Sequence, residues 1–156
     1  MVTIKQKTKT PMKISAVGET HARSVLKVRD VTEVIDEPIE RGGTNKGATP
    51  TETLMASLIG CTNVITQRIA HHMGVKTGIM GIELSCILDR RGVWLQEEID
   101  VPFEDVVMDI TLETDATPEQ MEAIKVDLSK YCPIEKVIGG AGTKITKNWT
   151  VVPIPA

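Results

Sequence analysis

Hydrophobic residues recur at helical spacing in the stretch between Pro50 and about His72. They form one apolar stripe, made of Leu54, Leu58, Cys61, Ile65 and Ile69 and widened by Met55, Ile59 and Thr62. Side chains three or four positions apart lie on the same face of a helix. Thr49 and Glu52 match a capping box, and Gly74 suits a left-handed cap at the other end. We therefore predict a helix from Pro50 to about His72, with Cys61 among packed side chains.

Two further helices are indicated near the end of the chain. A second capping box, formed by Thr117 and Gln120, predicts a helix that runs to about Lys130. Cys132 then directly precedes Pro133, and proline is favoured at the first position of a helix. A short helix is therefore predicted from this proline to the pair of glycines that follows PIEKVI.

Strand patterns fill much of the remaining chain. Short β-branched runs at 12–17 and 24–29, joined by a turn-like GETHA, predict a hairpin. Apolar and polar residues alternate at 79–89 and again at 106–112, and a closing strand is predicted at 143–152. Strands grouped around two main helices, without strict βαβ alternation, indicate an α+β fold.

Two segments lack a regular pattern. Residues 35–50 are rich in Gly, Pro, Thr and Asn, which predicts an irregular connection across the surface. Residues 90–105 suggest a turn at Arg91 and Gly92, followed by a further strand. With a length of 156 residues and no internal repeat, we expect residues 1–156 to form a single domain.

Composition narrows the range of partners. Only 3% of the residues are aromatic and the formal net charge is −3, which disfavours stacking on bases and attraction to phosphates. The basic N-terminal run MVTIKQKTKTPMK contains no apolar segment of signal-peptide length, and no window approaches the roughly 18 apolar residues of a membrane helix. We therefore expect a cytoplasmic protein that binds neither nucleic acid nor membranes.

Cysteines are the candidate chemical groups. Cys61 and Cys132 stand 71 positions apart on elements with strong local signatures, which favours redox chemistry over a structural disulfide in a reducing compartment. As a helix N-cap, Cys132 is predicted to be the more acidic thiol, whereas the apolar stripe around Cys61 predicts an inert one unless the fold supplies a cation. Cys86 alternates with apolar residues and is interpreted as core packing.

Histidines give no convincing metal site. His71 and His72 lie in the last turn of the first predicted helix, where a positive charge would interact favourably with the helix dipole. Ligand spacings such as C-x-x-C or H-x-x-x-H are absent from the sequence. Helix-end capping is the better interpretation, and we predict neither a metal nor another cofactor.

Two stretches carry a family resemblance. GGTNKGATPTETLMASLIGCTNVITQRIAHHMG, from Gly42 to Gly74, and YCPIEKVI, from Tyr131 to Ile138, together resemble the OsmC/Ohr superfamily of osmotically inducible and organic hydroperoxide resistance proteins. The arrangement PTE at residues 50–52 resembles a less characterised OsmC-like branch. The resemblance implies an α+β fold with antiparallel sheets around two main helices. It also implies an intertwined homodimer with active sites at the subunit interface.

The resemblance also implies roles for the two thiols. Cys61 matches the cysteine that attacks a peroxide and becomes a sulfenic acid. Cys132 matches the cysteine that then forms a disulfide with it, which a dithiol reductant reopens. This order differs from the local prediction that Cys132 is the more acidic thiol.

Polar partners of the thiol are less clearly matched. The hydroperoxide reductases pair an arginine with a glutamate directly after the helix-starting proline, and Thr51 stands at that position here. Glu52 follows one residue later, and its capping-box role accounts for it fully. Arg23 is the candidate arginine. Its alternatives are Arg29, Arg41 and Arg68, the last being seven positions after Cys61 on the same helix face.

Two functions follow from these observations. The first is a thiol-dependent peroxidase that reduces organic hydroperoxides, with catalytic residues Cys61, Cys132, Arg23 and Glu52. The alternative is a protein of the same fold that binds an apolar small molecule or carries sulfur with little or no peroxidase turnover. The missing glutamate at Thr51 supports this alternative.

Overall fold

The computed structural model describes residues 8–155, in which three α-helices accompany two three-stranded sheets. The predicted α+β fold is confirmed. The chain forms two compact units, of which one ends at Leu54 and the other begins at Met55. The prediction of a single domain stays a prediction. The start of the N-terminal run, residues 1–7, in which we expect no signal peptide, lies outside the described residues.

The first unit contains an antiparallel sheet of three consecutive strands. Strands β1 (Ser15–Gly18), β2 (Ser24–Val28) and β3 (Val31–Ile35) pair in the order β1-β2-β3. The predicted hairpin is therefore confirmed, although its first strand begins later than residue 12. Strand β3 was not predicted. Its sequence VTEVI is β-branched, and the tight turn before it uses Arg29 at φ 56°.

The connection from β3 to helix α1 (Pro50–His72) is irregular, as predicted, apart from a 3₁₀ turn at Ile39–Arg41. At the start of α1 the predicted capping box is formed. The backbone N–H of Thr49 donates to Glu52 Oε2 at 2.8 Å, and that of Glu52 donates to Thr49 Oγ1 at 3.2 Å. These two bonds satisfy donors that the first helical turn would otherwise leave free.

The second unit contains a mixed sheet. Strands β4 (Thr77–Cys86) and β5 (Asp105–Thr114) are antiparallel, whereas β6 (Lys144–Val152) is parallel to β5. The chain returns from β5 to β6 through α2 (Pro118–Tyr131) and α3 (Pro133–Gly140). The expectation of antiparallel sheets is therefore wrong for the pairing of β5 with β6. A crossover that contains helices brings the next strand back in the same direction.

Residues 87–104, between β4 and β5, contain turns and no strand, so the further strand predicted within 90–105 is not formed. The side chain of Asp89 accepts from the backbone N–H of Arg91 at 3.0 Å. The backbone N–H of Trp94 donates to the carbonyl of Arg90 at 2.9 Å, which closes a further turn. Because these donors bind within the segment, they are not available to a neighbouring strand.

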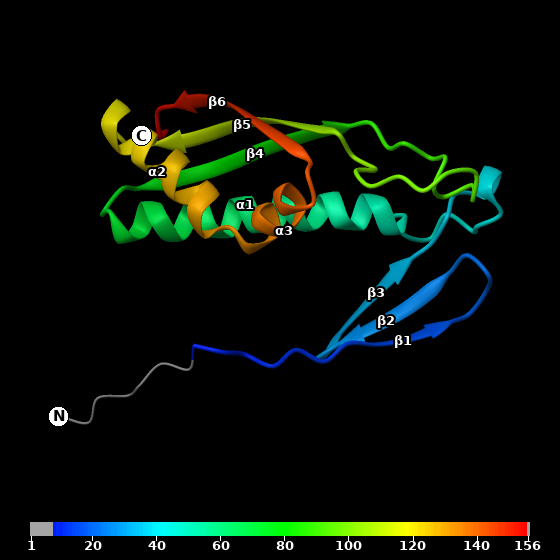
Figure 1. The fold of residues 1–156 in the computed structure, drawn as a ribbon. Helices are drawn as coiled ribbons and strands as arrows, with labels where there is room; N and C mark the ends of the chain where they lie inside the picture. Colours follow the sequence, from blue (N-terminus) through cyan, green and yellow to red (C-terminus); the bar gives the residue numbers. More distant parts are fainter. Residues whose placement is uncertain (1–7, 156) are drawn as a thin grey trace. The chain divides into compact units, whose positions relative to one another are not determined.

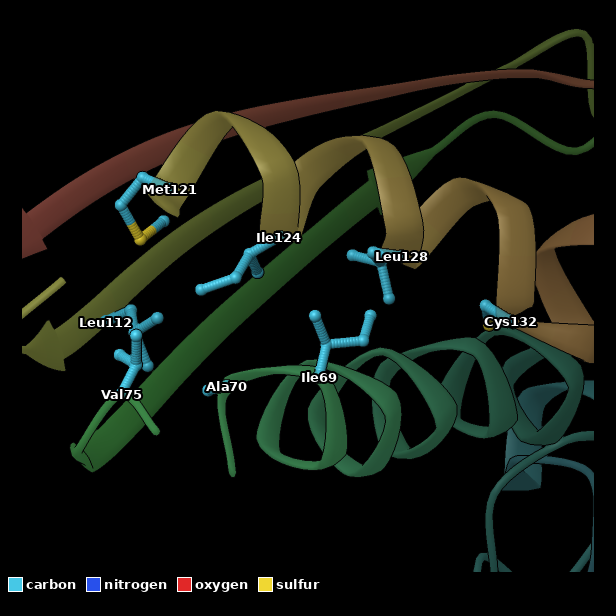
Figure 2. Close-up of a cluster of buried hydrophobic side chains, with 8 residues drawn as sticks. All are labelled: Ile69, Ala70, Val75, Leu112, Met121, Ile124, Leu128 and Cys132. Carbon is cyan, nitrogen blue, oxygen red and sulfur yellow. The ribbon is translucent and has the colours of Figure 1, made fainter. Parts of the chain in front are cut away.

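Helices α1, α2 and α3 lie on one face of the second sheet (Figure 1). The predicted alternation in β5 is confirmed, because four of its apolar side chains are buried under the helices: Val106, Met108, Ile110 and Leu112. Figure 2 shows Leu128 of α2 pointing toward Ile69 of α1, whereas Ile124 points toward the side of Leu112 and Val75. Full burial of such a side chain contributes roughly 1.5–3 kcal/mol. This packing holds the ends of α2 and α1 together.

The buried face of α1 differs slightly from the predicted stripe. Its buried residues are Met55, Leu58, Thr62, Thr66, Ile69 and Ala70. Leu54 is 42% exposed, while Cys61 and Ile65 are partly buried at the edge of the core. The helix ends as predicted, with Gly74 at φ 71°. Among the helices of residues 8–155, none combines the length and apolarity needed to cross a membrane.

Candidate functional site

The sulfurs of Cys61 and Cys132 lie 3.1 Å apart. Cys61 comes from the middle of α1, and Cys132 from the junction between α2 and α3. The core that joins α2 to α1 therefore brings together two residues that are 71 positions apart in sequence. A disulfide needs a separation of about 2 Å between its sulfurs, so only a small movement separates the two thiols from bonding distance.

Cys132 is held by both helices that meet at it. Its backbone N–H donates to the carbonyl of Leu128 at 2.9 Å and so ends α2. Its sulfur accepts the backbone N–H of Glu135 at 3.5 Å, so it is the predicted N-cap of α3. The side chain itself is completely buried. The position of this sulfur is therefore determined by the bend between the two helices.

The predicted acidity of Cys132 is wrong. Burial raises the pKa of the Cys132 thiol to about 11, and the neighbouring Cys61 sulfur adds to the increase. The N–H of Glu135 acts in the opposite direction but is outweighed. An N-cap position lowers the pKa of a cysteine only if its hydrogen bonds stabilise the thiolate by more than burial destabilises it through lost hydration. At neutral pH Cys132 is therefore a protonated thiol that donates toward the Cys61 sulfur.

Cys61 differs from Cys132 in accessibility. It is partly buried and packs at the edge of the cluster formed by α1, α2 and β5, as the apolar stripe predicted. Because Cys132 is fully buried, a reagent that enters from solvent can reach Cys61 more easily. Accessibility thus distinguishes an outer thiol from an inner one.

A nearly buried ion pair lies next to Cys132. Lys147 Nζ contacts Glu135 Oε1 at 2.5 Å and donates to Ser129 Oγ at 2.7 Å. The side chains of Lys147 and Glu135 are only 11% and 13% exposed. Sequence reasoning missed this pair. The available signal was the position of Lys147 between Ile145 and Trp149 in the alternating pattern of β6, which placed its side chain on the inner face.

Arg23 lies in the first unit and has two polar partners. Its guanidinium pairs with Glu19 Oε2 at 2.9 Å and donates to Thr44 Oγ1 at 2.7 Å. The alternative Arg41 pairs with Glu37 at 3.2 Å, and Arg29 is exposed in the turn between β2 and β3. Of the three arginines, Arg23 is the one held by both a carboxylate and a hydroxyl.

Asp36 is a second residue that sequence reasoning missed. Its buried carboxylate accepts the backbone N–H groups of Glu37, Thr44 and Lys46 and the hydroxyl of Thr44. The glycines in this loop allow the close approach, since a Cβ on Gly43 would lie 1.7 Å from the carbonyl oxygen of Glu37. The carboxylate therefore holds the loop that carries Thr44, the partner of Arg23.

Glu52 is charged and caps α1. Hydrogen bonds from the backbone and side chain of Thr49 lower the pKa of Glu52, and the positive charge of Arg41 lowers it further. Thr51, the residue directly after Pro50, shares a 3.2 Å hydrogen bond with the hydroxyl of Thr49. The carboxylate nearest to the helix start is thus Glu52, one position later along the helix.

The remaining candidates are an arginine, two histidines and the third cysteine. Arg68 lines a cavity of about 460 Å³ at the end of α1, with His72 and Tyr131 among its other walls. His71 and His72 are exposed in the last turn of α1. Cys86 packs against the core, and burial raises its pKa. Within residues 8–155, no group of three or more His, Cys, Asp or Glu side chains is arranged to hold a metal ion.

Comparisons with known proteins give matches over most of the chain. The sequence model of the family described as OsmC-like protein matches residues 43–148. An OsmC-like protein from Mycoplasma pneumoniae superimposes with a TM-score of 0.77 at 15% identity, covering 93% of this chain and 99% of its own. An organic hydroperoxide resistance protein from Elizabethkingia anophelis superimposes with a TM-score of 0.64 at 17% identity. The match covers 96% of this chain and 100% of that protein. An organic hydroperoxide resistance protein from Bacillus subtilis superimposes with a TM-score of 0.58 at 17% identity. The match covers 90% of this chain and 98% of that protein. No curated protein matches the sequence.

Proposed function

Because this chain belongs to the family of OsmC-like proteins, we propose that it is a thiol-dependent peroxidase that reduces organic hydroperoxides. The observation that carries the proposal is the 3.1 Å separation between the sulfurs of Cys61 and Cys132. The organic hydroperoxide resistance proteins among the similar structures add support at the level of the fold. A partly accessible thiol beside a buried one is the arrangement that a two-cysteine peroxidase requires.

The first step uses Cys61. Its thiolate attacks the outer oxygen of the hydroperoxide, the O–O bond breaks, and the alkoxide leaves with a proton as an alcohol. Cys61 becomes a sulfenic acid. Cys61 is assigned as the nucleophile because Cys132 is buried and protonated at neutral pH.

The second step uses Cys132. Its sulfur attacks the sulfenic sulfur of Cys61, the S–O bond breaks, and water leaves with the thiol proton. A dithiol reductant then restores both thiols by two exchange reactions. The apolar surroundings of Cys61 would favour substrates with an alkyl group over hydrogen peroxide, because the alkyl group can be buried there.

Catalytic roles are also proposed for two charged residues of the first unit. Arg23 supplies the positive charge that stabilises the thiolate and polarises the O–O bond. The hydroperoxide reductases pair an arginine with a glutamate at the position of Thr51. Glu52 is proposed to take the role of that glutamate. The support is that the guanidinium of Arg23 is oriented by Glu19 and Thr44, and that Glu52 has a lowered pKa.

We also propose that the protein works as a homodimer in the cytoplasm. Support for a dimer comes from exposed apolar side chains on and beside β1, namely Met12, Ile14 and Val17, which are 89%, 60% and 67% exposed. Exposed apolar side chains gathered in one short segment favour contact with another surface. A reducing compartment would keep the catalytic thiols available for each cycle.

Peroxide consumption by purified protein tests the function. We expect tert-butyl hydroperoxide to be consumed in the presence of a dithiol, with the activity lost in Cys61→Ser. In Cys132→Ser a sulfenic acid should form without turnover to a disulfide. Cys86→Ser is the matched control and should retain activity, because Cys86 packs against a different core cluster from the pair. Peroxide loss that is unchanged in Cys61→Ser and Cys132→Ser would exclude the enzyme and favour the small-molecule or sulfur-carrier alternative.

A further inference from the structure

Lys147 joins the two helical turns on either side of Cys132. Ser129 lies three residues before Cys132 in the last turn of α2, and Glu135 lies three residues after it in the first turn of α3. The ammonium group of Lys147 reaches both, at 2.7 Å and 2.5 Å. One side chain from β6 therefore bridges the bend at which the sulfur of Cys132 is held.

We propose that Lys147 is a positioning residue for the resolving step, holding Cys132 where its sulfur can attack Cys61. This inference rests on the proposed peroxidase function. Lys147 acts on Cys132 through Glu135 and Ser129, since its amine contacts those two side chains. Glu135 in turn donates its backbone N–H to the Cys132 sulfur at 3.5 Å.

The pair is built to hold a fixed geometry. Both charges are almost fully buried, so each one depends on the other for its stabilisation. The second oxygen of Glu135 is buried and has no hydrogen-bond partner within residues 8–155. The carboxylate is therefore anchored through the oxygen that contacts Lys147. Loss of the ammonium group would leave Glu135 free to turn away and would loosen the first turn of α3.

Position matters at this step because two reactions compete. The sulfenic acid of Cys61 either loses water to Cys132 and gives a disulfide, or reacts with a second hydroperoxide and gives a sulfinic acid and an alcohol. The first reaction needs the two sulfurs in line, whereas the second does not involve Cys132. A displaced Cys132 should therefore shift the products from disulfide to sulfinic acid.

The test compares these products in Lys147→Met. After excess tert-butyl hydroperoxide, mass spectrometry separates the disulfide, which has lost two hydrogens, from the sulfinic acid, which has gained two oxygens. We expect disulfide formation to be about tenfold slower than in the wild type and sulfinic acid to increase. The rate of sulfenic acid formation should stay the same. Lys147→Arg keeps the charge and should restore most of the disulfide rate.

Lys144→Met is the matched control. Lys144 lies on the same strand and pairs with Asp105 at 3.7 Å, but its side chain is 77% exposed. This variant should form the disulfide at the wild-type rate. If Lys147→Met does not fold, Ser129→Ala decides instead, because it removes one contact of the amine from an exposed position. A wild-type disulfide rate and product ratio in the folded variant would overturn the proposal.

A second oxidant separates this inference from the function on which it rests. Diamide takes up two hydrogens from a pair of nearby thiols and so forms the same disulfide without a peroxide. If the wild type does not react with hydroperoxide, the peroxidase proposal fails, yet diamide still reports how well the thiols are positioned. A slower reaction of Lys147→Met with diamide supports the positioning role. Equal rates for the two proteins contradict it.

Discussion

The carboxylate of Asp36 accepts the hydroxyl of Thr44 at 2.5 Å, and the oxygen of that hydroxyl in turn accepts the guanidinium of Arg23 at 2.7 Å. The chain Asp36–Thr44–Arg23 links a buried charge to the arginine proposed for catalysis. Because a hydroxyl that donates to a carboxylate is a better acceptor, the two bonds strengthen each other. Asp36 therefore supports Arg23 without contacting it.

Replacing Asp36 with asparagine should weaken the loop and the hold on Arg23. An amide offers a single acceptor oxygen to the four donors that now bind the carboxylate. We expect Tm to fall by several degrees in Asp36→Asn, measured by circular dichroism, and peroxidase activity to fall with it. Asp30→Asn, in the exposed turn between β2 and β3, is the control and should leave Tm unchanged. A stable and fully active Asp36→Asn would contradict the role of this chain of bonds.

The same carboxylate should make stability depend on acid pH. Burial alone raises the pKa of Asp36, but the hydrogen bonds from Thr44, Lys46 and Glu37 outweigh burial and lower it below its ordinary value. A lowered pKa stabilises the fold above the unfolded pKa of about 4, and this contribution disappears as pH falls through the folded value. Urea unfolding of wild type and Asp36→Asn from pH 6 to pH 2 should show their difference shrinking toward acid. A difference that is constant with pH would contradict the assignment.

Glu52 has a structural and a proposed catalytic role that one substitution can separate. Glutamine keeps an oxygen for the N–H of Thr49 and so keeps the cap, but it carries no charge. We expect Glu52→Gln to lower the free energy of unfolding by about 0.3–1 kcal/mol, through the lost charge at the helix N-terminus, and to lower peroxidase activity. Glu52→Ala should additionally cost roughly 1 kcal/mol of stability. Full activity in a stable Glu52→Gln would leave Glu52 with the capping role alone.

Local signals explain which parts of the fold were predicted correctly. The capping boxes at Thr49 and Thr117 were found because each involves residues three apart in the chain. The parallel pairing of β6 was missed because alternation reports which face is buried and not which strand is the neighbour. Strand β3 was missed because it is short and directly precedes an irregular loop.

The site shows the same division between local and distant effects. The position of Cys132 as an N-cap follows from Pro133, whereas its raised pKa follows from burial by α2, β5 and α1. Lys147 and Asp36 were missed because a single charged residue in a strand or loop is usually on the surface. Their burial depends on partners such as Glu135, which lies 12 positions from Lys147.

Two buried threonines on α1 offer a gain in stability. Thr62 and Thr66 are completely buried, and neither hydroxyl has a hydrogen-bond partner within residues 8–155. A buried hydroxyl without a partner costs about 1–3 kcal/mol, so Thr62→Val should raise the free energy of unfolding by roughly 1 kcal/mol. Urea denaturation measures the change. Thr53→Val is the control on the same helix and should give no gain, because its hydroxyl donates to the carbonyl of Thr49 at 2.9 Å. A loss of stability in Thr62→Val would show that its hydroxyl has a partner.

The buried thiol of Cys132 should make the protein less stable in alkali. Burial, together with the nearby Cys61 sulfur, raises its pKa from 9.0 to about 11. A raised pKa means that the folded state keeps the thiol proton at a pH where the unfolded state has lost it. The stability that this thiol contributes is therefore complete below pH 9 and is lost as pH rises toward about 11. Thermal unfolding between pH 8 and pH 11 should therefore show a steeper fall for wild type than for Cys132→Ala, whose side chain cannot ionise. Parallel curves for the two proteins would show that Cys132 is not the group that holds the proton, and would remove the reason for assigning Cys61 as the nucleophile.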